Sequence, residues 1–461
     1  MTRRLLILLT LALAVLLPPL LSGSRHLHQA EQAIAQGQPG RAAQSYAVAA
    51  SLLFWQTESW EKAGRAALEA GQTDLGIQYL RRAPHLSSEG WLALAQAYRR
   101  QGDLAAAEAA CQYALHNFGA NAPLYRLLAE IYQQQQNLPG EQSALQNLLL
   151  LDSQDAAAHY RLGLLLTMTQ PDQAFSHLLL ASSLDPQFAP VVRTLRTALT
   201  LADLQPTEAG RLVTLGRGLA LAEEWFLASQ AFQQATRIDR GNAEAWAWLG
   251  EAKQHLGRAG SAELDQALAL APRSVIVRGL RGLYWKRQGN LARALEEYQQ
   301  AAAIEPENPA WQATLGEIYA AQGDLVTALS TYQRAAQLAP DDPTYWRLLA
   351  LFCAEYLVHL EDVGLPAAQK AVELAPADAL TLDALGWAQS QAGRLFLAEQ
   401  SLLAALKQNP NLAMAHLHLG ITELRKGDRT TAYEHLLRAR DLAAGTSLAQ
   451  QAGQLLQQYF P

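Results

Sequence analysis

Apolar residues recur along this chain at helical spacing, and the whole pattern repeats at a period of about 34 residues. The stretch 309–342 shows the pattern most clearly. There, Trp311, Leu315 and Tyr319 stand four positions apart, which places them on one face of a helix. A second apolar stripe, which includes Tyr332, follows after a short polar break. We therefore predict that this stretch forms two helices joined by a tight turn.

Small and helix-breaking residues take fixed places in the same stretch. Gly316 has no side chain, so a neighbouring helix can approach it closely. Gly323 can adopt the left-handed conformation that ends a helix, Asp324 can cap the next helix, and Pro340 forbids further helix. The turn glycine returns along the chain as Gly37, Gly71, Gly102, Gly257, Gly289, Gly323, Gly393 and Gly427. This regular return predicts an array of helix pairs.

The unit resembles the tetratricopeptide repeat (TPR). The residues that carry the resemblance are Leu315, Gly316, Tyr319, Gly323, Ala328, Tyr332, Ala335 and Pro340. The resemblance implies an all-α fold, a right-handed α-solenoid in which about twelve helix-turn-helix units stack on one another. The units would start at residues 23, 57, 88, 122, 156, 209, 243, 275, 309, 343, 379 and 413.

One internal stretch, residues 189–208, does not fit the repeat. Its apolar residues lie on one face, and Pro190 is suited to the first turn of a helix, so we predict an extra helix near 190–205. This helix divides the array into an N-terminal part, 23–188, and a C-terminal part, 209–446. It either fills a gap in one continuous superhelix or forms a hinge.

The last stretch, residues 447–461, predicts one more amphipathic helix. A terminal repeat leaves an apolar face open, so a capping helix is expected there. The residues predicted to point inward are Leu448, Leu455, Leu456 and Tyr459.

The first segment, residues 1–24, is predicted to target or anchor the protein. Arg3 and Arg4 precede an uncharged apolar run, residues 5–21. As a helix this run reaches roughly 25 Å, slightly less than the roughly 30 Å core of a bilayer. It is either an uncleaved membrane anchor or a signal peptide that is removed. In both cases the arginines would stay cytoplasmic, and the repeats would be extracytoplasmic, either membrane-anchored or secreted into a space such as the periplasm.

Net charge and cysteine content narrow the classes of function. The net charge of −6 gives no basic surface for nucleic acid, so a nucleic-acid-binding helical repeat is only a remote alternative. Cys111 and Cys353 fall in different repeats on apolar faces. We therefore predict two buried free thiols and no disulfide between them.

No arrangement of residues in the sequence predicts catalysis. The motifs GxxxxGK[ST], HExxH, CxxC and GxSxG do not occur. His416 and His418 point to different sides of one helix, and His435 could approach one of them, but we expect no metal site there. Paired acids such as Glu296 and Glu297 are explained by helix capping and solvation. We therefore predict a protein that is not an enzyme and has no catalytic residues, cofactor or metal.

The TPR resemblance also implies where a partner would bind. In TPR proteins the first helices of the units form the inner wall of a groove. The apolar residues of this wall either accept an extended or helical segment of a partner or are covered by neighbouring repeats, and its arginines are either solvated or pair with a partner's acids. The candidate residues are Arg65, Arg99, Arg100, Arg126, Tyr160, Leu283, Lys286, Arg347, Trp387 and Leu417.

These observations predict a non-catalytic scaffold, tethered to or exported across a membrane, that binds partner proteins in its groove. The alternative is a structural subunit of a membrane or envelope assembly, including one for secretion or surface-polymer export.

TPR domains that bind chaperones hold a terminal carboxylate with lysine and asparagine at set groove positions. Those residues do not recur in that arrangement here, so a chaperone C-terminus is not expected as a ligand.

Overall fold

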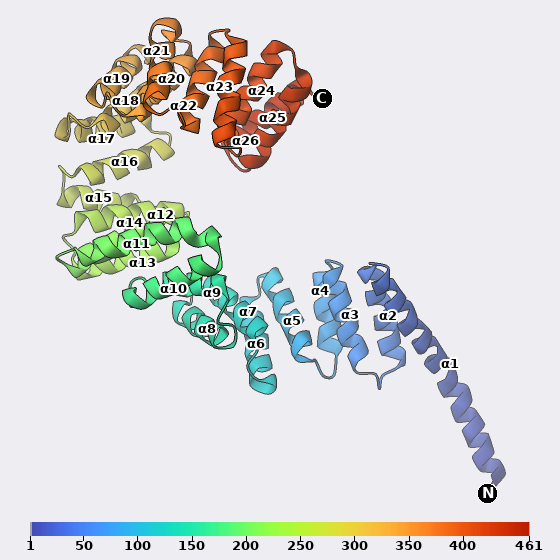
Figure 1. Cartoon of the computed structure of the whole chain (residues 1–461). Helices are drawn as coiled ribbons and strands as arrows, with labels where there is room; N and C mark the ends of the chain where they lie inside the picture. Colours follow the sequence, from blue (N-terminus) through green and yellow to red (C-terminus); the bar gives the residue numbers. More distant parts are fainter. Residues whose placement is uncertain (1, 461) are drawn as a thin grey trace. The chain divides into compact units, whose positions relative to one another are not determined.

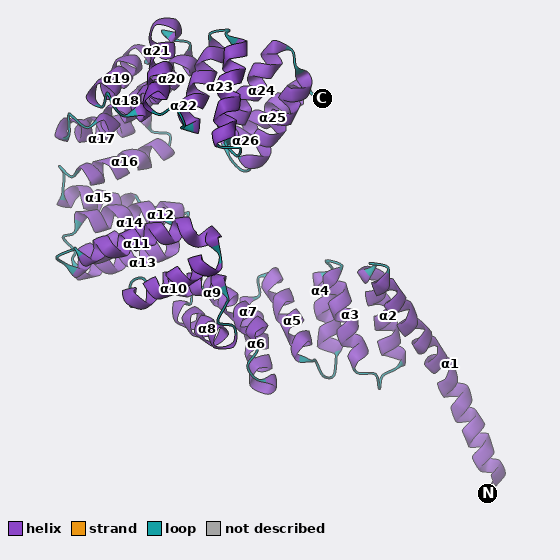
Figure 2. Ribbon diagram, in the orientation of Figure 1, coloured by secondary structure: helices purple, strands orange, loops and turns teal. Residues whose placement is uncertain are grey.

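The computed structural model describes residues 2–460 of the chain, with side chains from residue 17 onward. Within that range it contains 26 α-helices, two short helical turns and no strand (Figure 2). The predicted all-α fold is confirmed.

The described chain divides into two compact units. Unit 1 comprises the residues up to Thr207 together with Thr214–Ala231, and unit 2 comprises Glu208–Val213 together with the residues from Phe232 onward. Two helices, α12 (Glu208–Leu221) and α13 (Trp225–Ile238), contribute residues to both units.

Unit 1 contains five helix pairs and one extra helix. Its helices are α1 (Thr2–Ala35), α2 (Pro39–Leu52), α3 (Glu58–Glu69), α4 (Thr73–Arg82), α5 (Ser88–Gln101), α6 (Leu104–Phe118), α7 (Ala122–Gln134), α8 (Leu138–Leu151), α9 (Ala156–Leu166), α10 (Pro171–Leu184), the short turn η1 (Pro186–Phe188) and α11 (Ala189–Asp203).

Unit 2 continues the pairs and ends with a single helix. Its helices are α14 (Ala243–His255), α15 (Ser261–Leu270), α16 (Val275–Arg287), α17 (Leu291–Ile304), α18 (Pro309–Ala321), α19 (Leu325–Leu338), α20 (Pro343–Tyr356), the π-helical turn η2 (Leu360–Gly364), α21 (Leu365–Leu374), α22 (Ala379–Gln391), α23 (Leu395–Gln408), α24 (Ala413–Lys426), α25 (Arg429–Leu442) and α26 (Ser447–Tyr459).

Consecutive helices pack against each other as pairs, as α24 and α25 show in Figure 1. After the first pair, the first helix of each pair begins within one residue of a predicted unit start. The arrangement is consistent with the predicted twelve units. The first unit differs, because its first helix is α1, which begins at Thr2 and not at residue 23.

A glycine in the first helix of a pair lets the second helix approach closely. A Cβ on Gly316 would lie 2.9 Å from the ring of Tyr332, which is closer than carbon atoms pack. Gly323 adopts the left-handed φ of +84°, and the Asp324 carboxylate accepts a hydrogen bond from the Thr327 backbone N–H at 3.1 Å. The predicted roles of the two glycines and the cap are therefore confirmed.

The extra helix α11 is present where it was predicted. Its buried face includes Val192, Leu195 and Ala198. A Cβ on Gly218 would lie 2.2 Å from the Cβ of Ala198, so the backbone of α12 passes directly over α11. The apolar face of α11 is thus covered within unit 1.

The predicted capping helix corresponds to α26. Ala452 and Leu456 are buried against Leu417 and Leu436 of the last repeat. Tyr459 was also predicted to point inward but is exposed. Because α26 ends at this residue, no further turn of helix covers its ring.

The predicted anchor, residues 5–21, lies mostly where side chains fall outside the described part of the structure. Its backbone belongs to α1, a continuous helix that contains Pro18 and Pro19 and whose C-terminal half packs on α2 through Ala30 and Ala33. No described helix is both long enough and apolar enough for a membrane span.

The two cysteines are free and buried, as predicted. Burial raises the pKa of the Cys111 and Cys353 thiols to about 12. Both thiols are therefore protonated at neutral pH and serve as small apolar packing groups.

We predict that Gly316→Val destabilises the protein by about 1–3 kcal/mol, because the added methyl groups would collide with Tyr332 in a packed seam. Urea unfolding followed by circular dichroism measures the change. Gly453→Ala is the matched control, since a Cβ at Gly453 meets no atom within 4 Å. This control should be stabilised by up to about 1 kcal/mol through helix propensity. Equal stability of Gly316→Val and the parent would contradict the role of the seam.

Candidate interaction surfaces

Four successive first helices of unit 2, α18, α20, α22 and α24, together with Tyr332 of α19, line a groove of about 290 Å³, here called the unit 2 groove. Tyr356 and Met414 present exposed apolar surface in it, and Glu317 and Glu355 add carboxylates. The groove thus combines apolar surface with negative charge. Its lining residues are Glu317, Ala320, Tyr332, Leu348, Leu351, Phe352, Glu355, Tyr356, Trp387, Met414 and His418.

Trp387 lines the unit 2 groove but is only 7% exposed. Its ring stacks on the His418 ring with centroids 4.2 Å apart. The Nδ1 atom of His418 lies 2.8 Å from the Oδ1 atom of Asp383. This α22–α24 contact therefore holds the indole within the protein, and little of the indole surface is exposed to a partner.

Leu417, another candidate for the groove wall, is 2% exposed. Its side chain packs with Leu436, Ala452 and Leu456, under the capping helix α26. In this structure the side chain belongs to the seam between the last repeat and its cap, away from the unit 2 groove.

The other unit 2 candidates are half-buried on first helices. Lys286 of α16 forms an ion pair with Glu317 of α18, with 2.6 Å between Nζ and Oε1. Leu283 lies on the same helix as Lys286, and Arg347 lies on α20. Lys286 therefore has a partner in the next repeat.

In unit 1, Arg65 and Arg100 lie in a second groove of about 490 Å³ between α3 and α5, here called the unit 1 groove. The Nη1 atom of Arg65 lies 2.7 Å from Oε2 of Glu89. Arg100 is exposed in the last turn of α5. The structure thus brings these two predicted arginines to the same groove.

The remaining unit 1 candidates contact neighbouring elements of the array. Arg99 pairs with Glu130 at 3.3 Å, and Arg126 pairs with Asp155 at 2.7 Å. Tyr160 stacks on Phe188 with ring centroids 4.6 Å apart, and burial raises the pKa of its hydroxyl to about 12. Arg99 and Arg126 are therefore neither simply solvated nor unpaired, because Arg99 pairs with an acid of the next repeat and Arg126 pairs with the residue that caps α9.

Protein-family models for the tetratricopeptide repeat match the chain in both units. One model matches residues 61–123 and 253–309, and another matches residues 287–352. The matched segments have the helix-pair geometry described above. The chain contains tetratricopeptide repeats. No curated protein matches its sequence significantly.

Several solved structures resemble this TPR protein. A chain of the APC/C hetero-tetramer Cut9–Hcn1 has 15% identity and a TM-score of 0.44, with 95% of this chain and 96% of that chain covered. Yeast Tom70 also has 15% identity and a TM-score of 0.44, with 95% of each chain covered. YrrB, a TPR protein with an unusual peptide-binding site, has 22% identity and a TM-score of 0.29, with 41% of this chain and 97% of that chain covered.

Several buried carboxylates that the sequence pattern did not reveal are paired with arginines within the array. Glu141 of α8 accepts hydrogen bonds from Arg161 of α9, and Arg161 also reaches Glu224 at 3.0 Å. Burial lowers the pKa of Arg161, but the hydrogen bonds and charges of the two glutamates outweigh it, so the pKa is raised overall. Glu141 stands where other repeats carry a small residue, and that departure was the signal available in the sequence.

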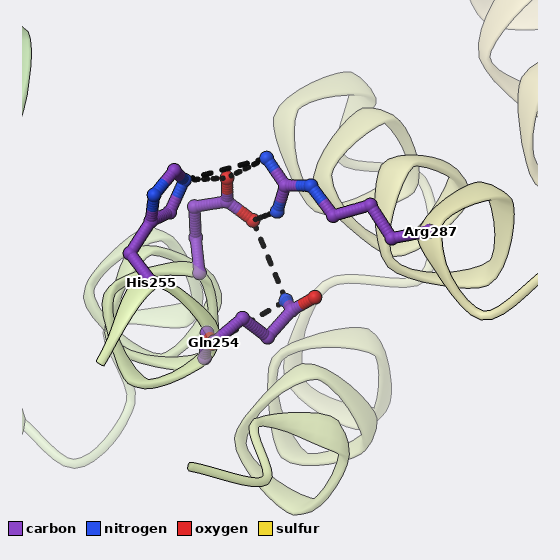
Figure 3. Close-up of polar contacts among 5 residues, drawn as sticks. Gln254, His255 and Arg287 are labelled. Carbon is purple, nitrogen blue, oxygen red and sulfur yellow. Dashed lines mark hydrogen bonds and ion pairs between the residues drawn. The ribbon is translucent and has the colours of Figure 1, made fainter. Parts of the chain in front are cut away.

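Glu251 shows the same arrangement between the first helices of two adjacent TPR units. Glu251 is 3% exposed, and its carboxylate accepts two hydrogen bonds of 2.8 Å from Arg287, a bidentate pair. Figure 3 shows His255 and Gln254 on the other sides of the carboxylate. The Glu251–Arg287 pair therefore fixes the register of α14 against α16.

The prediction that capping and solvation explain Glu297 is wrong. This residue is 3% exposed and binds Arg278 at 2.7 Å and also Arg281, both from the preceding helix α16. Here a carboxylate on the second helix of a pair forms ion pairs with two arginines of the first helix. Its neighbour in sequence, Glu296, remains exposed.

We predict that Arg287→Met lowers the free energy of unfolding by about 3 kcal/mol, because it leaves the buried Glu251 carboxylate without its cation. The double variant Glu251→Met/Arg287→Met should lose less, since no buried charge remains. Urea unfolding of the parent, both single variants and the double variant measures the difference. A single variant no less stable than the double variant would contradict this account.

Two histidine pairs occupy equivalent places in two repeats, one in each unit. In unit 2 the Nδ1 atoms of His416 and His435 lie 2.9 Å apart, and Nε2 of His416 donates to the Pro410 carbonyl at 3.1 Å. The predicted approach of His435 to another histidine is thereby confirmed. In unit 1 the same contact joins His159 and His177 at 2.8 Å. A hydrogen bond between two Nδ1 atoms requires at least one neutral ring.

Burial lowers the pKa of His177, His416 and His435, and in His177 and His435 the paired histidine lowers it further. A histidine in the unfolded chain has a pKa of about 6.5, so below that pH the unfolded state binds more protons than the folded state. Stability is therefore complete above about pH 6.5 and is lost as the pH falls through this value toward the lower folded pKa.

We predict that the melting temperature falls between about pH 7.5 and about pH 5.5, and that the fall is smaller in the double variant His177→Gln/His435→Gln. The glutamine amide can still donate to the remaining histidine but does not titrate. Thermal unfolding of both proteins at the two pH values measures this. An equal fall in both would show that other groups control the pH dependence.

Proposed function

We propose that this TPR protein is a non-catalytic scaffold that binds partner proteins on the walls formed by its first helices. TPR proteins bind protein partners, and the unit 2 groove supports this role for the present chain. Four repeats contribute to that groove, and its exposed residues Tyr356 and Met414 give a partner apolar surface to cover.

The partner segment that suits the unit 2 groove is extended or helical and carries both apolar and basic side chains. Its apolar side chains would pack on Leu351, Tyr356 and Met414. A basic side chain would lie near Glu355, which is exposed at the groove. Pairing of opposite charges would fix the direction of the segment.

The chemistry of the unit 2 groove favours binding over reaction. His418 and Asp383 do form a histidine–carboxylate pair, but both are buried and the Trp387 ring covers the imidazole. This pair therefore positions the indole and two helices.

The further proposal that the chain is tethered to or exported across a membrane rests on its sequence. Residues 5–21 carry no charge and follow Arg3 and Arg4. We infer that the repeats lie outside the cytoplasm, on an uncleaved anchor or after removal of the segment.

We predict that the double variant Tyr356→Ala/Met414→Glu loses the partner of the unit 2 groove, because it removes apolar surface and places a charge there. Both residues are exposed, so the fold should survive. Cross-linking in the native membrane, followed by purification and mass spectrometry, identifies the proteins that the parent holds. The double variant should lose them by at least about tenfold.

Leu397→Glu is the matched control for this experiment. Leu397 is an exposed apolar residue of α23, a second helix that does not line the unit 2 groove. The control should keep every partner. Full retention of partners by the groove variant would show that they bind elsewhere.

Sidedness can be tested separately from partner binding. We predict that a protease added to intact cells stripped of their outer layers digests the chain beyond residue 24. A cytoplasmic protein of the same cells, which should stay intact, is the control. Full protection of the repeats until the membrane is lysed would overturn the proposed orientation.

A further inference from the structure

Unit 1 has a second concave surface, away from the unit 1 groove, where one second helix of this unit is shorter than the others. The second helix α4 has ten residues, whereas α6, α8 and α10 have 15, 14 and 14. The helix starts show the same shortening, because α5 begins 30 residues after α3 (58 to 88) while α7 begins 34 residues after α5 (88 to 122). Helix α4 thus ends at Arg82 and is about one turn shorter than α6, α8 and α10.

The missing turn leaves a cavity of about 760 Å³ beside α5 and α6, here called the α4 notch. The floor of the notch is one face of α6, which carries Ala106, Ala109, Ala110 and Tyr113. Trp91 of α5 borders this floor, with its ring centroid 4.4 Å from that of Tyr113.

Two of the aromatic side chains at the α4 notch remain open to solvent. Tyr113 and Phe118 are each 50% exposed, although both are large and largely apolar. Neighbouring alanines form a shallow floor between these rings, so a helix could approach closely. The surface therefore has the shape and chemistry of a seam between repeats from which one helical turn is absent.

The charge around the α4 notch is positive. Arg81 and His85 are its only titratable residues apart from tyrosine, and none of the described residues that line it is acidic. The unit 2 groove differs in this respect, because Glu317 and Glu355 line it. The two surfaces would therefore select segments of opposite charge.

We propose that the α4 notch is a second protein-binding site, which takes an amphipathic helical segment of a partner with an apolar face and acidic residues beside it. The segment supplies the turn that α4 lacks, packs its apolar side chains against Trp91 and Tyr113, and pairs a carboxylate with Arg81. A helix in an apolar groove is a recurring mode of peptide recognition. This site is independent of the unit 2 groove, so either proposal can fail without the other.

The test uses two fluorescent peptides of about fifteen residues, long enough for partial helicity in water. Both carry leucine and phenylalanine on one helical face and alanine and glutamine on the other. One has glutamate at both ends and the other has lysine. Fluorescence anisotropy with the full chain should show roughly fivefold tighter binding of the glutamate peptide.

Variants of the full chain locate the site. Ala109→Glu places a bulky charge on the floor of the α4 notch and should weaken the glutamate peptide by at least about tenfold. Ala105→Glu, an equal change at an exposed alanine of α6 that does not line the notch, should leave binding unchanged. Arg81→Glu should reverse the preference to the lysine peptide, whereas Arg41→Glu, the same charge change on α2, should not.

Several results would overturn the proposal. They are the absence of saturable binding of the glutamate peptide, equal binding of both peptides, and an Ala109→Glu variant that binds as tightly as the parent. A dimer in analytical ultracentrifugation that Ala109→Glu abolishes would also overturn it, because the occupant would then be a second copy of this chain. Circular dichroism of each variant confirms that the helices are intact.

Discussion

The close contact between the two helices of a repeat is the constraint on which the rest of this structure depends. In most repeats a glycine of the first helix faces an apolar side chain of the second so closely that a Cβ would overlap it. The pairs are Gly64 with Leu80, Gly163 with Leu178, Gly250 with Leu264, Gly282 with Tyr298, Gly316 with Tyr332, Gly386 with Leu402 and Gly420 with Leu436. Because each pair contacts mainly its neighbours, the walls and grooves are set by how accurately these seams stack.

Charged side chains add a second layer of order between helices. Glu141, Glu251 and Glu297 are buried and each meets one or more arginines of an adjacent helix. Burying such pairs contributes little net stability, but breaking one leaves an unpaired charge, so a wrong register is costly. The same pairing occupies much of the positive charge on the first helices. That leaves the exposed apolar residues as the main feature that a partner would meet in the unit 2 groove.

The repeat period and the turn glycines were enough to predict the helix pairs. Apolar faces in the two stretches outside the repeat were enough to predict the extra helix α11 and the cap α26, because each of these depends on local spacing. The partners of single side chains could not be predicted in this way. Leu417 is buried between α25 and α26, and Trp387 is fixed by His418 of the next repeat. A position within one repeat does not reveal what the neighbouring repeat places opposite to it. The short α4 was visible as a change in spacing, but the cavity beside it required coordinates.

Hydrogen exchange read by mass spectrometry on Gly386→Val tests the central claim most directly. A Cβ at Gly386 would lie 2.6 Å from Leu402 and 3.1 Å from the Ala398 carbonyl, so this substitution should force one seam open. Stacked pairs predict loss of protection in α22 and α23, a smaller loss in the adjoining α20 and α24, and no change in α14 to α17. Uniform loss of protection across unit 2, or no loss in α22 and α23, would contradict the account.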